Sequence, residues 1–130
     1  MNAPSEDVKD MLLADTELGL TFAEDLFINR EPATPDNVVT IFDSYGSPPY
    51  IGLTNTGYEY PSIQIRARGN DSRVTFNLLN EIYLSLHGRA HETWNDTLYE
   101  SIICTNVPTL LDWDDNGRCR FIINLNLQRR

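Results

Sequence analysis

Apolar and polar side chains alternate most regularly in two segments of the chain. In residues 61–68 apolar side chains occupy every second position, and polar ones, among them Arg66 and Arg68, occupy the others. Residues 118–128 repeat this pattern, with Arg120 on the polar side. Because successive side chains of a strand point to opposite faces, each segment is predicted to be a strand with one buried face and one polar face.

Apolar residues recur at helical spacing in two other segments. The first helix is predicted to begin at Pro4 or Ser5, either of which suits a helix start, and to end before Gly19. The second is predicted to run from a cap at Asn70 or Asp71 to Leu86, with a stop at Gly88. The predicted buried row of the second helix is Val74, Leu78, Ile82 and Leu86, widened by Leu79 and Tyr83.

Three further strands complete the predicted fold. Residues 25–29 and 37–43 are predicted to form an antiparallel pair joined by a turn over residues 30–36, and residues 97–106 form another strand. The sequence therefore predicts one α+β domain spanning residues 1–130. Its sheet is mostly antiparallel, with about five strands, and two main helices pack on one face.

Residues 44–60 differ from the rest of the chain. They contain three glycines, two prolines and four of the six tyrosines, and they are predicted to be one long loop. Tyrosine gives a large contact area at low entropic cost and is enriched at binding hot spots, so this loop is interpreted as a docking arm. The alternative is a loop folded onto its own sheet. The tyrosines are Tyr45, Tyr50, Tyr58 and Tyr60.

The formal net charge is −9, and all of it lies in the first half of the chain. Residues 1–60 contain 11 acidic and 2 basic residues, whereas residues 61–130 contain 8 of each. Binding to duplex DNA or to an anionic membrane needs clustered basic residues, so neither is predicted. The acidic half is either an ordinary solvated surface or a surface that repels a polyanion.

Two patterns look like metal sites. His87 and His91 are four residues apart, but Gly88 between them is predicted to end the helix, so the rings need not share a face. Residues 112–117 match the start of a calcium-binding EF-hand loop, yet Ile123 stands where that loop needs a bidentate glutamate. The segment is predicted to be a hairpin turn in which Asn116 and Gly117 supply positive φ angles.

Common catalytic and cofactor-binding motifs are absent from the sequence. It contains no phosphate-binding loop, dinucleotide fingerprint, nucleophile elbow or paired-histidine zinc motif, so no catalytic residue, metal or cofactor is predicted. No apolar run reaches the roughly 18 residues of a membrane span, and no secretory signal pattern begins the chain. Cys104 and Cys119 are therefore expected to be free thiols in a reducing compartment, without a disulfide.

The order of these elements, over about residues 5–130, resembles the tail terminator proteins of long-tailed bacteriophages, also called tail completion or minor capsid proteins. The segments that carry the resemblance are the strand pair 26–28 and 38–42, the strand Pro61–Gly69 with the helix after it, Pro108 with the turn 112–118, and the strand 121–127. The resemblance implies a structural, non-enzymatic virion protein in the neck or tail, assembled in the host cytoplasm. It implies a self-assembled ring, usually hexameric, that ends the tail tube and joins it to the head connector.

The resemblance also directs attention to surfaces for self-assembly, for the tail tube protein and for a head-completion protein, while DNA passes through the lumen without specific binding. A closed ring needs two different patches on each subunit. Arg66, Arg68 and Arg120 are predicted to meet carboxylates of a neighbouring copy, or else to pair within their own subunit or only with solvent. The predicted interface comprises these arginines, the four tyrosines, Asp43 and Glu59, with Asp36 as a further candidate carboxylate.

Three alternative functions stay open at the sequence level. One is a head-completion or adaptor protein of the connector. Another is a small calcium-binding or hydrolytic domain that uses Asp112, Asp114 and Asn116. The third is a monomeric adaptor that binds a protein ligand through its tyrosines.

Overall fold

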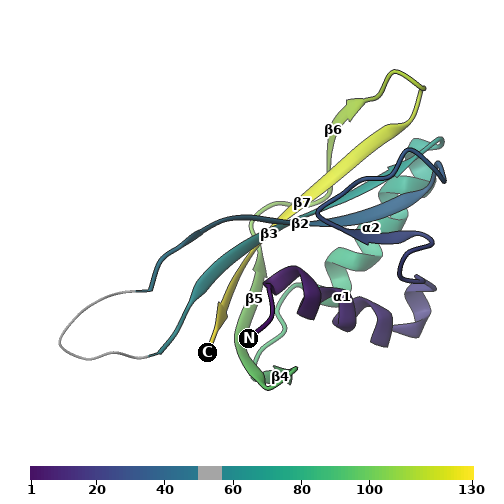
Figure 1. Cartoon of the computed structure of the whole chain (residues 1–130). Coiled ribbons are helices and arrows are strands. Elements are labelled where there is room, and N and C mark those ends of the chain that lie inside the picture. Colours follow the sequence, from purple (N-terminus) through teal and green to yellow (C-terminus); the bar gives the residue numbers. More distant parts are fainter. Residues whose placement is uncertain (50–56) are drawn as a thin grey trace.

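The computed structural model describes residues 1–49 and 57–130 (Figure 1). In these residues seven strands form one mixed sheet in the order β1-β2-β3-β7-β5-β4, and β6 pairs with β7. The elements are α1 (Pro4–Ala14), the 3-10 helix η1 (Thr16–Leu18), β1 (Leu26–Ile28), β2 (Val38–Ser47), β3 (Tyr60–Gly69), α2 (Ser72–Leu86), β4 (Glu92–Trp94), β5 (Thr97–Cys104), β6 (Thr109–Trp113) and β7 (Cys119–Arg129). The predicted α+β class with helices on one face is confirmed, while the predicted count of five strands missed β4 and β6.

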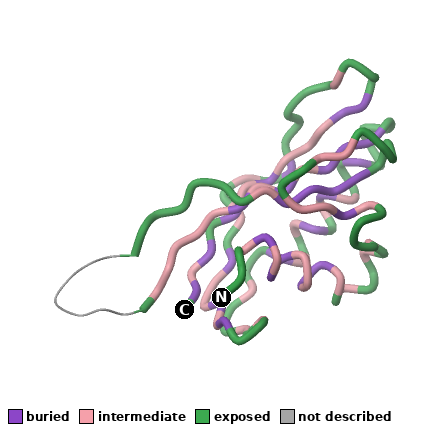
Figure 2. Tube along the Cα trace, viewed as in Figure 1, coloured by how far each residue is buried: buried purple, intermediate pink, exposed green. Residues whose placement is uncertain are grey.

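The central pair of the sheet is β3 with β7, antiparallel and without interruption from Ser62–Asn126 to Gly69–Cys119. Their alternating patterns match across the pair, so that Ile63 and Ile65 lie with Leu125 and Ile123 on the face covered by α1 and α2. Both strands were predicted from their alternation, and both are confirmed. The apolar core is therefore a single layer between the sheet and the two helices (Figure 2).

Helix α2 begins where the sequence predicts, because the Asp71 side chain accepts hydrogen bonds from the amides of Arg73 and Val74. The row of α2 residues predicted to face the core is wrong in the first turn, because Val74 is 59% exposed. The buried residues are Thr75, Leu79, Ile82 and Leu86. The Thr75 hydroxyl donates to the Asp71 carbonyl at 2.8 Å, which lets this polar side chain occupy a buried position.

Strand β1 is parallel to β2, so the predicted antiparallel hairpin is wrong. The connection between them does not turn tightly. It crosses the sheet face opposite the helices, where Arg68 binds the carbonyls of Pro32 and Pro35 and Arg118 binds that of Ala33. This crossing returns the chain to the end of the sheet where β1 began, and β2 then starts in the same direction.

Both ends of the segment 44–60 belong to strands, where the sequence predicted a loop. Strand β2 continues to Ser47, and β3 begins at Tyr60, which pairs with Ser47 after a bulge. Residues 50–56 lie outside the described part of the chain. No helix in the described residues is long and apolar enough to span a membrane.

The assignment of the buried face of α2 can be tested by substitution. Leu79→Ala should lower the free energy of unfolding by about 2–5 kcal/mol, because Leu79 is fully buried and its truncation leaves a cavity. Val74→Ala, five residues earlier on the exposed face, should change it by less than about 0.5 kcal/mol. Urea unfolding followed by circular dichroism measures both, and equal losses would contradict the observed helix phase.

Candidate functional site

The β2–β3 hairpin extends beyond the helix-covered part of the sheet as a projecting arm (Figure 1). The described arm residues are 44–49 on the outgoing limb and 57–60 on the returning limb. The outgoing limb is exposed throughout (Figure 2). The Tyr45 side chain on it is fully exposed. The two limbs approach closely at Gly46, where an added Cβ would collide with the backbone of Tyr60 and Pro61.

The other tyrosines predicted to dock partners occupy different surroundings. Tyr58 donates a hydrogen bond to Glu100 at 3.0 Å, and the Arg130 guanidinium lies over its ring. Tyr60 is half-buried and lines a groove on the sheet. Tyr50 lies outside the described residues. Of the described tyrosines of this segment, Tyr45 is therefore the one whose ring is completely available to a partner.

The returning limb of the arm is held by Arg129 at the end of β7. The Arg129 guanidinium donates to Glu59 at 3.0 Å, and the backbones of the two residues exchange hydrogen bonds of 2.7 and 3.0 Å. The same guanidinium binds the Tyr99 hydroxyl at 3.2 Å, and that hydroxyl donates to the fully buried Asp7 carboxylate of α1. The base of the arm is thus connected through ionic hydrogen bonds to the helix layer.

The predicted interface carboxylate Asp43 also has partners within the chain. It accepts hydrogen bonds from the amide and hydroxyl of Ser5 at 3.1 and 2.7 Å, and from the Asn29 side chain at 2.7 Å. Asp43 therefore ties the start of α1 to the middle of β2. Whether Asp43 or Glu59 also contacts a neighbouring copy stays a prediction.

The three predicted interface arginines converge on Glu31 rather than on solvent. Arg120 approaches Glu31 at 2.9 Å, Arg68 at 3.2 Å and Arg66 at 3.9 Å. Arg120 also pairs with Asp112 at 3.1 Å. Pairing within the subunit, which the sequence left as the alternative, is what the structure contains, and contacts of Arg66 and Arg120 with another copy stay a prediction.

The Arg68 side chain lies on the predicted polar face of the strand but is buried there, with only 2% of it exposed. Its guanidinium donates to the carbonyls of Pro32 and Pro35 at 2.6 Å each, and to that of Asp36 at 3.1 Å. The segment 31–36 thus covers one end of the outer sheet face, and Arg68 binds it in place. Strand alternation assigned the face correctly but contained no signal for a cover contributed by a distant loop.

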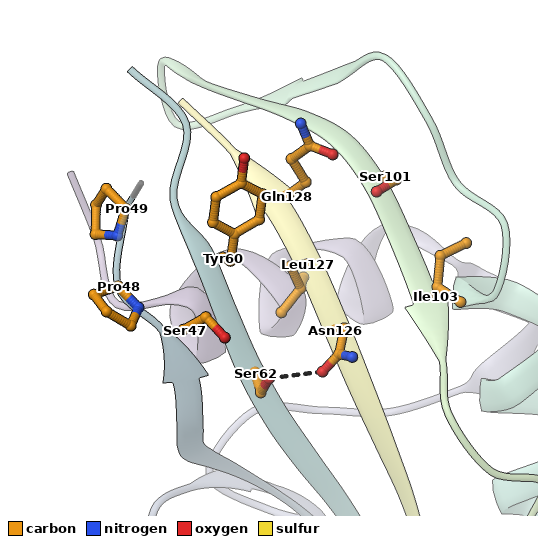
Figure 3. Close-up of a pocket in the computed structure, with 10 residues that line it drawn as sticks. All are labelled: Ser47, Pro48, Pro49, Tyr60, Ser62, Ser101, Ile103, Asn126, Leu127 and Gln128. Carbon is orange, nitrogen blue, oxygen red and sulfur yellow. Dashed lines mark hydrogen bonds between the residues drawn. The ribbon is translucent and has the colours of Figure 1, made fainter. Parts of the chain in front are cut away.

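The other end of the same face is open and forms a groove of about 840 Å³ (Figure 3). Its floor crosses three strands and includes Ser62, Asn126 and Ser101, with a 2.7 Å hydrogen bond from Ser62 to Asn126. Pro49 lies on one side of the groove, and Ile103 lies on the opposite side. All ten lining residues are uncharged, in contrast to the cluster around Glu31. This groove could not be predicted from the sequence, because its described residues come from four separate segments.

Comparison with known proteins assigns the family. A family model described as "Bacteriophage tail terminator protein" matches residues 13–130. The chain belongs to the bacteriophage tail terminator family. The resemblance inferred from the sequence is thereby confirmed, and the family is one of structural, non-enzymatic phage proteins.

A solved structure shares the fold of this tail terminator. A chain of the structure titled "Virion of native gene transfer agent (GTA) particle" superposes with a TM-score of 0.77 over 98% of this chain and 94% of that chain. Its sequence identity is 11%, so the likeness shows a shared fold alone. No curated protein sequence matches the chain.

The metal-like patterns of this tail terminator have other local roles. The His87 ring accepts a hydrogen bond from the Cys104 amide at 2.9 Å and stacks on Tyr83, whereas His91 pairs with Glu100 at 2.8 Å. Among the described residues there is no group of three or more histidine, cysteine or acidic side chains placed to hold a metal ion. Cys104 and Cys119 are free, as predicted, and burial raises the pKa of the Cys104 thiol to about 11.

The EF-hand-like segment is a hairpin turn between β6 and β7, as the sequence favoured. The Asp114 carboxylate accepts hydrogen bonds from the amides of Asn116 and Arg118 and from the Arg118 guanidinium at 2.7 Å. Gly117 has a φ of 74°, as predicted, but Asn116 is not among the positive-φ residues. Desolvation raises the pKa of the Asp114 carboxyl, yet these hydrogen bonds together outweigh it and lower the pKa below its usual value.

The role of Arg68 in holding the covering segment can be tested by Arg68→Lys. Lysine keeps the charge but cannot bridge several carbonyls in one plane, so the free energy of unfolding should fall by about 1–3 kcal/mol. The exposed Arg73→Lys on α2 is the matched control and should change it by less than about 0.5 kcal/mol. Urea midpoints that coincide for the two variants would show that Arg68 does not hold the segment.

The turn carboxylate gives a pH-dependent prediction. Because the pKa of folded Asp114 lies below the ordinary 3.8, its contribution to stability is present above that value and disappears as the pH falls through the folded pKa. Asp114→Asn should therefore destabilise the protein at pH 7, and its deficit should shrink below about pH 4. Thermal unfolding from pH 2.5 to 7 measures this, with Asp115→Asn as the control for an equal change in charge. A deficit independent of pH would rule out the ionised carboxylate as its source.

Proposed function

We propose that this tail terminator forms a closed ring at the head-proximal end of the phage tail tube, stops tube polymerisation and joins the tail to the head connector. The observation that carries the proposal is the projecting arm in a chain whose family is one of tail terminators. An arm that leaves the folded layer supplies a contact surface outside the subunit's own core. Such a surface suits an assembly protein more than an enzyme, whose reactive groups converge in a cleft.

The composition of the arm supports a role in protein contacts. The segment 44–58 contains no Asp, Glu, Lys or Arg, although the whole chain carries a net charge of −9. Protein interfaces are depleted of charge at their centre and enriched in tyrosine. Tyr45, which makes its ring fully available, fits the position of an anchor for the tube or for a neighbouring subunit.

The charge distribution supports a lumen that does not retain DNA. Residues 1–25 contain seven acidic residues, all but Asp7 at least partly exposed, and Lys9 as their one base, and α1 and η1 belong to the layer of helices on one side of the sheet. A surface of this sign repels phosphate and lowers the residence time of DNA. In the proposed ring, this acidic layer would be compatible with passage of the genome, and no base-reading or phosphate-binding surface is required.

The proposal predicts the effect of shortening the arm. A chain that lacks residues 50–56 should keep the circular dichroism spectrum and unfolding midpoint of the full chain, because the described core contacts lie outside this segment. It should fail to restore infectious particles to a terminator-deficient phage, because the hairpin that we propose contacts other proteins is shortened. Plaque counts and electron microscopy of the tails provide the measurement.

The control is Leu84→Ser on α2, which removes another strongly exposed apolar side chain without touching the arm. It should restore infectious particles as the natural chain does. Full rescue by the shortened chain would show that residues 50–56 are not needed for assembly. Binding of the purified protein to DNA-filled heads but not to isolated tail tubes would favour a head-completion protein instead.

A further inference from the structure

The outer face of the sheet is divided into two regions of opposite character. One end carries the arginines around Glu31 and is covered by the segment 31–36. The other end is the groove over β3, β7 and β5, which is lined by uncharged residues and lies open (Figure 3). Ile103 at its border is 45% exposed. An open, uncharged groove on a strongly acidic protein is a surface on which like-charged copies can meet without direct repulsion.

The outgoing limb of the arm has matching chemistry. Ser44, Tyr45, Gly46 and Ser47 are all exposed and uncharged. Strand β1 pairs with β2 at residues 39–41, and the Asn29 side chain accepts from the Asp43 amide at 2.8 Å. Among the described residues, strand pairing of the limb beyond Asp43 occurs on the β3 side alone. The limb therefore presents a free strand edge next to a fully exposed tyrosine.

We infer that the groove binds the outgoing limb of a second copy of this chain, with the Tyr45 ring against Ile103 and Pro49. The side chains of Asn126, Gln128 and Ser101 line the groove and offer hydrogen-bonding groups to the backbone of the incoming limb. Neither surface brings a charge into the contact, so no ion must be desolvated without a partner.

This contact joins two different surfaces, the Ser44–Gly46 part of the limb on one copy and the groove on the next, one wall of which is formed by Ser47, Pro48 and Pro49 of that copy's own limb. Such head-to-tail contacts produce a ring when the rotation between copies closes and a filament when it does not. The inference therefore rests on the proposed ring and deepens it by naming the two surfaces that join its subunits. It also assigns the arm's described limb to the neighbouring subunit, while the tail tube meets another part of the ring.

Two substitutions test the contact from its two sides. Tyr45→Arg removes the arm's anchor, and Ile103→Arg places a charge at the groove, both at exposed positions that should leave the fold intact. In sedimentation velocity up to about 1 mM protein, each variant alone should self-associate at least about tenfold more weakly than the natural chain. Leu84→Arg, on the helix side of the sheet, adds the same charge at another exposed apolar position and should associate like the natural chain.

Mixing the two variants distinguishes a head-to-tail contact from any other. The natural arm of the Ile103→Arg chain can enter the natural groove of the Tyr45→Arg chain, but the complementary contact is blocked at both surfaces. The equimolar mixture should therefore form a one-to-one dimer and no larger species. Absence of this dimer, or self-association of either variant at natural strength, would overturn the inference.

The tests separate the proposed function from the proposed arm–groove contact. A natural chain that stays monomeric up to 1 mM but restores tails in a terminator-deficient phage would overturn the arm–groove contact and leave the function standing. Self-association through these surfaces in a chain that restores no tails would overturn the proposed function and leave the arm–groove contact standing.

Discussion

The antiparallel pairing of β3 with β7 is the constraint on which the rest of the structure depends. Its register, from Ser62–Asn126 to Gly69–Cys119, sends one set of side chains into the helix-covered core and the other to the outer face. A slip by one residue would exchange the two sets and place arginines in the core. Because β7 also pairs with β5 and β6 along its other edge, the same register fixes the position of the groove and of the β6–β7 turn.

The outer face shows how one sheet surface acquires two roles. At one end, Arg66, Arg68 and Arg120 surround Glu31, Arg120 also pairs with Asp112, and Arg68 binds loop carbonyls, so these charges take part in contacts within the subunit. At the other end, none of the described residues that line the groove is charged. The division follows from the path of the segment 31–36, which reaches one end of the face only. Charge that is satisfied internally cannot steer assembly strongly, whereas an uncharged open surface can be buried at low desolvation cost.

The arm is continuous with the core rather than appended to it. Arg129 connects Glu59 at the arm's base to Tyr99 and through it to the buried Asp7 of α1. Asp43 on the outgoing strand is bound to Ser5 at the start of the same helix. Both limbs are therefore oriented by contacts with α1. A rigid base lowers the entropy lost when a projecting segment binds a partner.

The sequence by itself determined the features that depend on neighbouring residues along the chain. These are the alternation of β3 and β7, the Asp71 cap of α2, the Asp114 turn and the family resemblance, each of which the structure or the comparisons bear out. Only the tertiary structure decided that β1 runs parallel to β2, that Arg68 is buried and that a groove opens beside Ile103. Each of these depends on where a remote segment crosses the sheet, and that path is fixed by hydrogen bonds between residues more than thirty positions apart, such as Arg68 with Pro32 and Pro35. Periodicity reports which face a side chain takes, but the cover over that face is a property of the folded chain.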